Sequence, residues 1–250
     1  MGIDPASEED AAQGECPQYV YGILRASAPL DLGRIGLGAP PALVRTVHEA
    51  GMAALVSESP GPRVAPTRTH LLVHQRVTEA VLREHSLLPV AFGTVLPSLA
   101  RVREVLRAAR EPLSRALEMI HGRLELGLKV RCHREHLARQ LEVEAPALAR
   151  HPAEPEGAHA HRLDAAVSER ATRDMATVLT DLRPLAASLR EDPPLGEHML
   201  LNASFLVDRD EVANFEARVR ALALRTEAYA FRLTGPWPPY SFVQRRLGED

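Results

Sequence analysis

The sequence has few of the residues that mark secreted, membrane-spanning or nucleic-acid-binding proteins. It contains two cysteines, Cys16 and Cys132, and one lysine, Lys129. We expect Cys16 in a disordered leader and Cys132 at the end of a strand, which argues against a structural disulfide. No apolar run approaches the roughly 18 residues of a membrane span, and no segment resembles a signal peptide. These absences predict a soluble, cytoplasmic protein without a membrane partner.

The net charge is also small once the start of the chain is set aside. Residues 1–15 carry five acidic residues and no basic one, so without them the formal net charge changes from −3 to +2. We therefore expect a disordered acidic leader over residues 1–17. A nearly neutral remainder argues against a nucleic-acid partner, because such proteins concentrate positive charge.

The length of 250 residues suits two modest domains. Patterning predicts strands over residues 19–25, 52–56, 87–92, 124–132, 198–207 and 229–233, and helices over 42–50, 70–85, 133–144 and 162–183, with further helices after Ser98, Pro112 and Asp208 or Asp210. This alternation predicts an α+β fold divided into residues 18–122 and 123–243, followed by a tail over 244–250.

Two apolar stripes identify helical faces. The first is expected to be Val73, Val77 and Val81, with Leu72 and Ala80 beside them. The second comprises Leu163, Val167, Ala171, Met175, Val178 and Leu182, and Pro184 should end its helix. Such a stripe either packs on its own core, which is the usual arrangement, or offers a surface to a partner.

Motifs for catalysis, cofactors and metals are weak. The run from Gly33 to Gly38 lacks the spacing of a dinucleotide or phosphate-binding loop, so a flexible turn is expected. The histidine groups His70/His74, Cys132/His133/His136 and His159/His161 provide too few donors for a zinc site. Ser241 lies outside any nucleophile motif and is expected to support a turn. We predict no catalytic, cofactor-binding or metal-binding residue, and no enzyme activity.

The segment from Leu233 to Val243 holds three prolines and three aromatic residues, Trp237, Tyr240 and Phe242. The prolines are expected to end the preceding strand and to continue it as an extended arm. The aromatic residues then have two interpretations. They fold back and close the core of their own domain, or part of this edge stays exposed as a partner-binding anchor.

Several segments resemble one family in the same order along the chain. They are residues 19–23 (Tyr-Val-Tyr-Gly-Ile), 88–95 (Leu-Pro-Val-Ala-Phe-Gly-Thr-Val), 125–130, 201–207 and the Pro-rich aromatic segment. The resemblance is to the gas vesicle protein GvpL/GvpF family. Two places depart from its pattern: Ala91 replaces a usual arginine, and residues 157–163 lack an aromatic residue that the family often has.

The resemblance implies an N-terminal ferredoxin-like domain and a C-terminal α+β domain with a long helical hairpin. It also implies a non-enzymatic accessory protein of gas vesicle assembly, which binds the apolar major shell protein and other accessory proteins. The alternative is a ferredoxin-like regulatory protein that senses a ligand or a metal, and an enzyme of unrecognised type comes third.

Overall fold

A computed structural model describes residues 16–152 and 154–243, and it confirms the α+β class. The described residues form two compact units, one of residues 16–124 and 237–243 and the other of residues 125–152 and 154–236. The sequence-based division placed residues 237–243 with the C-terminal part, whereas in the structure they cluster with the first unit. The acidic leader, except Cys16 and Pro17, and the tail over 244–250 lie outside the described residues.

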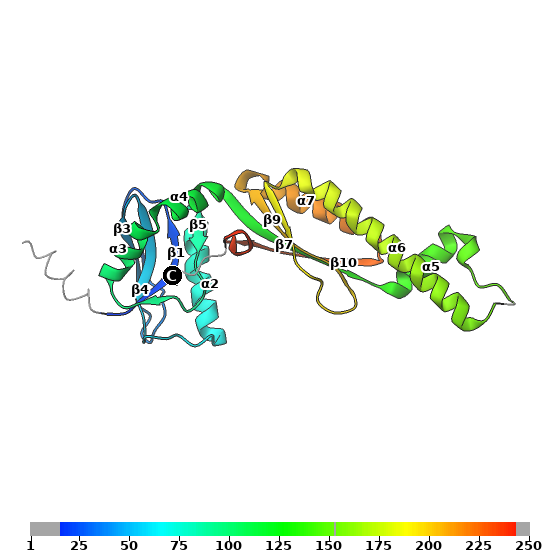
Figure 1. Cartoon of the computed structure of the whole chain (residues 1–250), viewed down its shortest axis with the longest axis horizontal. Helices are drawn as coiled ribbons and strands as arrows, with labels where there is room; N and C mark the ends of the chain where they lie inside the picture. Colours follow the sequence, from blue (N-terminus) through cyan, green and yellow to red (C-terminus); the bar gives the residue numbers. More distant parts are fainter. Residues whose placement is uncertain (1–15, 153, 244–250) are drawn as a thin grey trace, which may run out of the picture. The chain divides into compact units, whose positions relative to one another are not determined.

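The first unit is built on a sheet with strand order β2-β3-β4-β1-β5, and β6 also pairs with β1 (Figure 1). The strands are β1 (Gln18–Leu24), β2 (Asp31–Arg34), β3 (Leu43–Glu49), β4 (Met52–Glu58), β5 (Leu87–Pro89) and β6 (Val95–Leu96). Gly22 in β1 is required by packing, because a Cβ there would lie 2.7 Å from Leu87 Cδ1 and 2.8 Å from the Leu88 carbonyl oxygen. The glycine of the opening motif therefore lets β5 approach β1.

The helix expected over residues 42–50 is wrong, because this segment is strand β3. It pairs antiparallel with β4 from Arg45↔Val56 to Glu49↔Met52. The two residues between them, Ala50 and Gly51, have φ angles of 53° and 78°. Positive φ at both positions is the geometry of a two-residue hairpin. The spacing of buried Val44 and Val47 imitates a helix, but long-range pairing decides the structure.

The described helices of the first unit are α2 (Arg68–Leu82), α3 (Leu99–Ala108) and α4 (Arg110–Met119). The Ser98 N-cap is confirmed, since its Oγ accepts a hydrogen bond from the Arg101 N–H at 3.2 Å. Pro112 lies in the first turn of α4, where its missing N–H breaks no helical bond. The apolar side chains of α3 and α4 form a core with β1, β3, β4 and β5.

The buried stripe of α2 includes the expected Val77 and Val81 but is wider than predicted, while Val73 is only half-buried. Its buried residues are His74, Val77, Thr78, Val81 and Leu82. Leu72 was expected beside the stripe but is 52% exposed. A histidine and a threonine therefore face the interior, and apolarity alone did not identify them.

The second unit has a sheet with strand order β10-β7-β9-β8. Its strands are β7 (Arg123–Cys132), β8 (Ser188–Glu191), β9 (Met199–Asp208) and β10 (Tyr229–Trp237). Its helices are α5 (Arg134–Glu144), α6 (Glu156–Leu182) and α7 (Val212–Ala223), with short 3-10 turns η2 (Pro146–Leu148), η3 (Arg183–Leu185) and η4 (Arg209–Glu211). These helices share one apolar core with β7, β9 and β10 (Figure 1).

The long stripe of α6 packs inward, as the usual interpretation of such a stripe predicts. Val167, Ala171, Met175, Val178 and Leu182 are all buried in the core of the second unit. The helix ends at Leu182, and Pro184 follows in η3. The stripe is therefore used within the protein.

Three details of the second unit differ from expectation. Strand β8 was not expected. The aspartates before α7 do not cap it, since Glu211 is the N-cap residue and makes no side-chain capping bond. Strand β10 continues through Pro236 to Trp237, whereas the prolines were expected to end it. An edge strand tolerates a proline because one side of it needs no ladder hydrogen bond. β10 is such an edge.

Helix α6 is fixed to β10 by a polar contact at the rim of this core. The Tyr229 hydroxyl donates to Asp174 Oδ2 at 2.6 Å, and Arg170 Nε donates to Asp174 Oδ1 at 3.0 Å. Burial and the neighbouring Asp174 raise the pKa of Tyr229. The hydroxyl therefore stays protonated and available as a donor.

Among the described helices, none combines the length and apolar character that a membrane crossing requires.

Candidate partner-binding surface

The aromatic arm, residues 237–243, folds back onto the first unit and stays partly accessible. Pro238 and Pro239 are buried, Trp237 and Phe242 are half-buried, and Tyr240 is 40% exposed. The arm ends in a 3-10 turn, η5 (Tyr240–Phe242), in which the Tyr240 N–H donates to the Pro238 carbonyl at 2.7 Å. The arm therefore packs against the first unit and leaves part of Tyr240 accessible.

A hydrogen-bonded chain holds the arm on the unit. The Tyr19 hydroxyl of β1 lies 2.9 Å from His74 Nδ1 of α2, and His74 Nε2 lies 3.0 Å from the Tyr240 hydroxyl. Tyr19 also accepts a hydrogen bond from the Gly93 N–H at 3.1 Å. One buried imidazole therefore links strand β1, helix α2 and the last described segment of the chain.

The surroundings of His74 keep its ring neutral. The rings of Tyr19, Tyr21 and Phe92 lie 5.8, 5.7 and 5.6 Å from it, centroid to centroid. Burial lowers the pKa of His74 to about 4 and raises the pKa of Tyr19. A neutral imidazole has one N–H donor and one acceptor. It can accept from Tyr19 and donate to Tyr240 at the same time.

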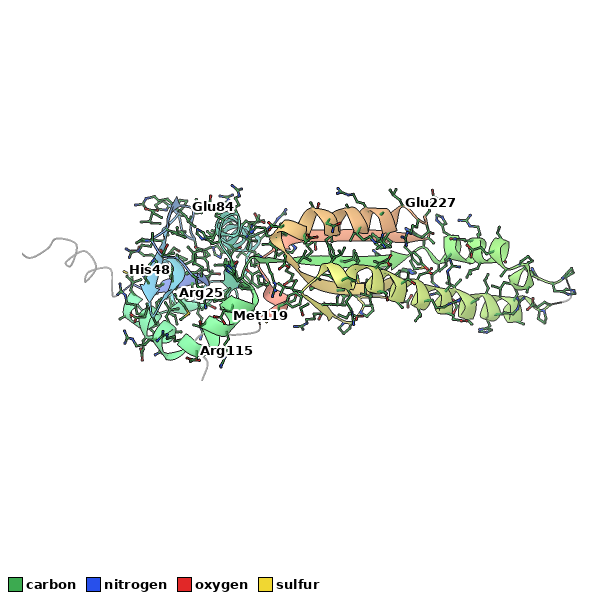
Figure 2. The ribbon with its side chains drawn as sticks, turned by 90° about the horizontal axis from the view of Figure 1, so that it is seen from above. Arg25, His48, Glu84, Arg115, Met119 and Glu227 are labelled. Carbon is green, nitrogen blue, oxygen red and sulfur yellow. The ribbon has the colours of Figure 1, made fainter. Side chains whose placement is uncertain are left out.

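Beside the end of the arm lies an apolar groove of about 340 Å³, all within the first unit. Its lining comes from β1, β5, α4 and the arm: Ile23, Leu88, Pro89, Val90, Pro112, Leu113, Arg115, Ala116, Met119, Phe242 and Val243. Met119 is 42% exposed, although a methionine gains free energy by burial. Figure 2 labels Met119, Arg115 and Arg25 on this unit. The groove is open, apolar and of ordinary ligand-pocket size.

Two arginines near helix α4 differ in their pairing, and one of them, Arg115, lines the groove. Arg25 donates to Ser114 Oγ at 2.8 Å and to Glu118 Oε1 at 3.2 Å, both on α4. Arg115 on the same helix is exposed and forms no hydrogen bond or ion pair within the described part of the chain. The groove therefore carries one guanidinium that is available to a partner.

The structure gives the Gly33–Gly38 segment no role in phosphate binding. A phosphate loop needs several backbone N–H groups that point at the ligand. Here the Gly33 N–H donates to Asp31 Oδ1 at 2.7 Å, the Gly36 N–H to the Ala42 carbonyl at 2.9 Å, and the Leu37 N–H to the Tyr21 hydroxyl at 3.0 Å. These donors are used inside the unit.

The histidine groups likewise show no metal site. Within residues 16–152 and 154–243, no three His, Cys, Asp or Glu side chains are placed to hold a metal ion. His70 Nδ1 lies 2.8 Å from the Ala65 carbonyl oxygen, and both ring nitrogens of His74 bond to tyrosines. His159 Nε2 lies 3.1 Å from the Leu148 carbonyl oxygen.

Cys132, His133 and His136 lie at the start of α5 beside His198, around a surface cavity of about 590 Å³. Burial raises the pKa of the Cys132 thiol, which disfavours the thiolate that metals bind.

Sequence reasoning named Trp237, Tyr240 and Phe242 but missed the residues that meet them. The structure brings Phe242 to the groove and Tyr240 to His74. The only signal for His74 was a polar residue on the side of α2 next to the apolar stripe. The groove requires β1, β5 and α4 to meet, and these segments are far apart in sequence.

Comparison with known proteins gives the family. The family model "Gas vesicle synthesis protein GvpL/GvpF" matches residues 17–244. Gas vesicle protein F of a Streptomyces species is 32% identical over 237 residues, covering 90% of this chain and 99% of that protein. Gas vesicle protein L of the same organism is 30% identical over 256 residues, covering 90% of this chain and 92% of that protein. Gas vesicle protein F2 of Halobacterium salinarum is 29% identical, with 93% and 94% covered.

Solved structures agree on the fold. The crystal structure of gas vesicle protein GvpF from an Anabaena species superposes with a TM-score of 0.74 at 21% identity, covering 94% of this chain and 100% of that one. GvpF from Microcystis aeruginosa gives a TM-score of 0.73 at 20% identity, covering 92% and 100%. The fold matches along nearly the whole chain, and the family model spans both units, so this chain belongs to the GvpL/GvpF family of gas vesicle accessory proteins.

Proposed function

We propose that this protein acts in gas vesicle assembly, without catalytic activity, by binding the apolar major shell protein. The family match over residues 17–244 supports a role in gas vesicle formation. The groove is the observation that supports a binding role, since it is apolar, open and bordered by an exposed methionine. A protein of this kind is expected in the cytoplasm and at gas vesicles, with other accessory proteins as further partners.

The physical reason lies in the problem that the shell protein poses. A small subunit with large apolar faces aggregates unless another surface covers those faces before assembly. Interface anchors are commonly aromatic or apolar side chains that fill pockets, surrounded by a polar rim. Phe242 in the groove and the partly exposed Trp237 and Tyr240 on the same arm fit this pattern, and we propose them as contact residues.

Co-expression with the shell protein tests the proposal. The tagged full chain is expected to retain the shell protein during purification at micromolar concentrations. Met119→Glu places a charge in the groove and should abolish retention. Leu224→Glu is the matched control, because Leu224 is an exposed apolar residue of the second unit, 88% accessible. Retention that is absent in the unmodified chain, or equal in both variants, would reject the proposed function.

A further inference from the structure

Helix α4 presents one continuous stripe to the groove. Pro112, Ala116 and Met119 recur at spacings of four and three, which places them on the same face of the helix. Ala116 is small, so the stripe is hollow at its centre and raised at both ends. Phe242 and Val243 line the groove from the arm. A binding segment would thus lie between a helix and the arm.

The chemistry of the lining restricts what can bind. Apart from Arg115, all lining side chains from the described residues are apolar. Apart from the Arg115 guanidinium, no described lining side chain could replace the hydrogen bonds to water that a small polar ligand would lose there. Aliphatic side chains, in contrast, gain free energy in proportion to the apolar area that they bury. The groove therefore favours aliphatic groups.

The charge at the groove adds a second restriction. Arg115 has no acidic partner in the described part of the chain, whereas Arg25 nearby is engaged by Ser114 and Glu118. A guanidinium without an acidic partner favours complementary negative charge on the molecule that binds beside it.

We infer that the groove binds a segment of a partner protein that inserts aliphatic side chains and places a carboxylate on Arg115. The inference rests on the proposed function in that the partner is the gas vesicle shell protein. Arg115 and the carboxylate form a partly exposed ion pair, which contributes orientation and selectivity more than affinity. Burial of the aliphatic side chains supplies most of the binding energy.

Overlapping fifteen-residue peptides that span the shell protein sequence, labelled with fluorescein, provide the test by fluorescence anisotropy with the full chain. Peptides in which aliphatic residues neighbour an Asp or Glu are expected to bind, and replacing that acid by Lys should weaken binding about five- to tenfold. In Arg115→Glu the preference should reverse, so that the Lys peptide binds more tightly. Met119→Glu should weaken both peptides.

Three results overturn the inference: no peptide binds, acidic and Lys peptides bind alike, or the preference survives Arg115→Glu. If the intact shell protein co-purifies while any of these holds, the inference fails and the proposed function stands. If the peptides bind as expected but the intact protein does not co-purify, the proposed function fails.

A variant truncated after Val243 tests whether the chain's own C-terminal residues compete with the partner for the groove. Residues 244–250 contain Leu247, Glu249 and Asp250, which offer the same chemistry as the inferred partner. If this shortened chain binds the acidic peptides as tightly as the full chain does, the inference stands. If its affinity is tenfold higher or more, the tail is the occupant of the groove and the inference is overturned.

Discussion

Acid should weaken the first unit because His74 is buried as a neutral base. Its pKa is about 4 in the folded chain against an ordinary value of 6.5, and burial is the cause. Between these values the unfolded chain binds more protons than the folded one, so the free energy of unfolding falls as the pH falls from about 6.5 to 4. At 1.36 kcal/mol per pKa unit, the full loss is about 3 kcal/mol.

The geometry around His74 explains why the protonated ring is not stabilised in the folded chain. The Tyr19 hydroxyl oxygen already accepts a hydrogen bond from the Gly93 N–H. When the His74 ring is neutral, its Nδ1 can accept a hydrogen bond from the Tyr19 hydroxyl. A protonated ring donates from both nitrogens, which leaves the Tyr19 proton without that acceptor. The described groups around the ring are Tyr19, Tyr21, Phe92 and Tyr240, and none of them offers a negative charge to stabilise an imidazolium.

Urea unfolding at a series of pH values measures the effect, with fluorescence as the signal. Trp237 is the only tryptophan of the sequence; it ends β10 and begins the arm, so its fluorescence reports on unfolding at the arm that His74 holds. His74→Gln keeps a neutral hydrogen-bonding side chain but removes the titration. From pH 7 to pH 4 the unmodified chain should lose about 3 kcal/mol more unfolding free energy than the variant does. Parallel pH profiles would refute the reasoning.

Two further predictions concern packing and the arm. Gly22→Ala should lower the free energy of unfolding by about 1–3 kcal/mol, since its Cβ would meet Leu87 and the Leu88 carbonyl below 3 Å. Gly157→Ala in α6 is the control, because a Cβ there would meet open space. Urea titration of this variant should show an unchanged free energy of unfolding or a gain of up to about 1 kcal/mol. Equal losses of unfolding free energy in the Gly22 and Gly157 variants would contradict the packing argument. Tyr240→Phe should cost about 1 kcal/mol by the same assay, and Tyr19→Phe more, because it also removes the acceptor of the Gly93 N–H. A larger loss of unfolding free energy for Tyr240→Phe than for Tyr19→Phe would contradict the roles given to these hydroxyls in the hydrogen-bonded chain.

Local patterns in the sequence predicted the elements that are decided locally. The stripe of α6 from Val167 to Leu182 and the Ser98 cap of α3 follow from helical spacing and from a single hydroxyl. Strand β3 was misjudged because its valines have helical spacing, and only its pairing with β4 reveals a strand. Pro236 was expected to end β10, but whether a proline is tolerated depends on the strand being an edge.

The candidate site was predictable only in part for the same physical reason. Proline and aromatic residues clustered in sequence pointed to Trp237, Tyr240 and Phe242. Their partners are separated from them by more than a hundred residues: the hydrogen bond from Tyr240 to His74 spans 166 positions. Such contacts arise from the topology of the fold, and no local pattern contains them.

Site-specific photocrosslinking tests the central claim most directly. A photoreactive amino acid in place of Met119, in cells that form gas vesicles, should crosslink this protein to the shell protein, and the same residue in place of Leu224 should not. Both variants must still support vesicle formation for the comparison to count. Vesicles that form normally while position 119 captures no shell protein would contradict the account.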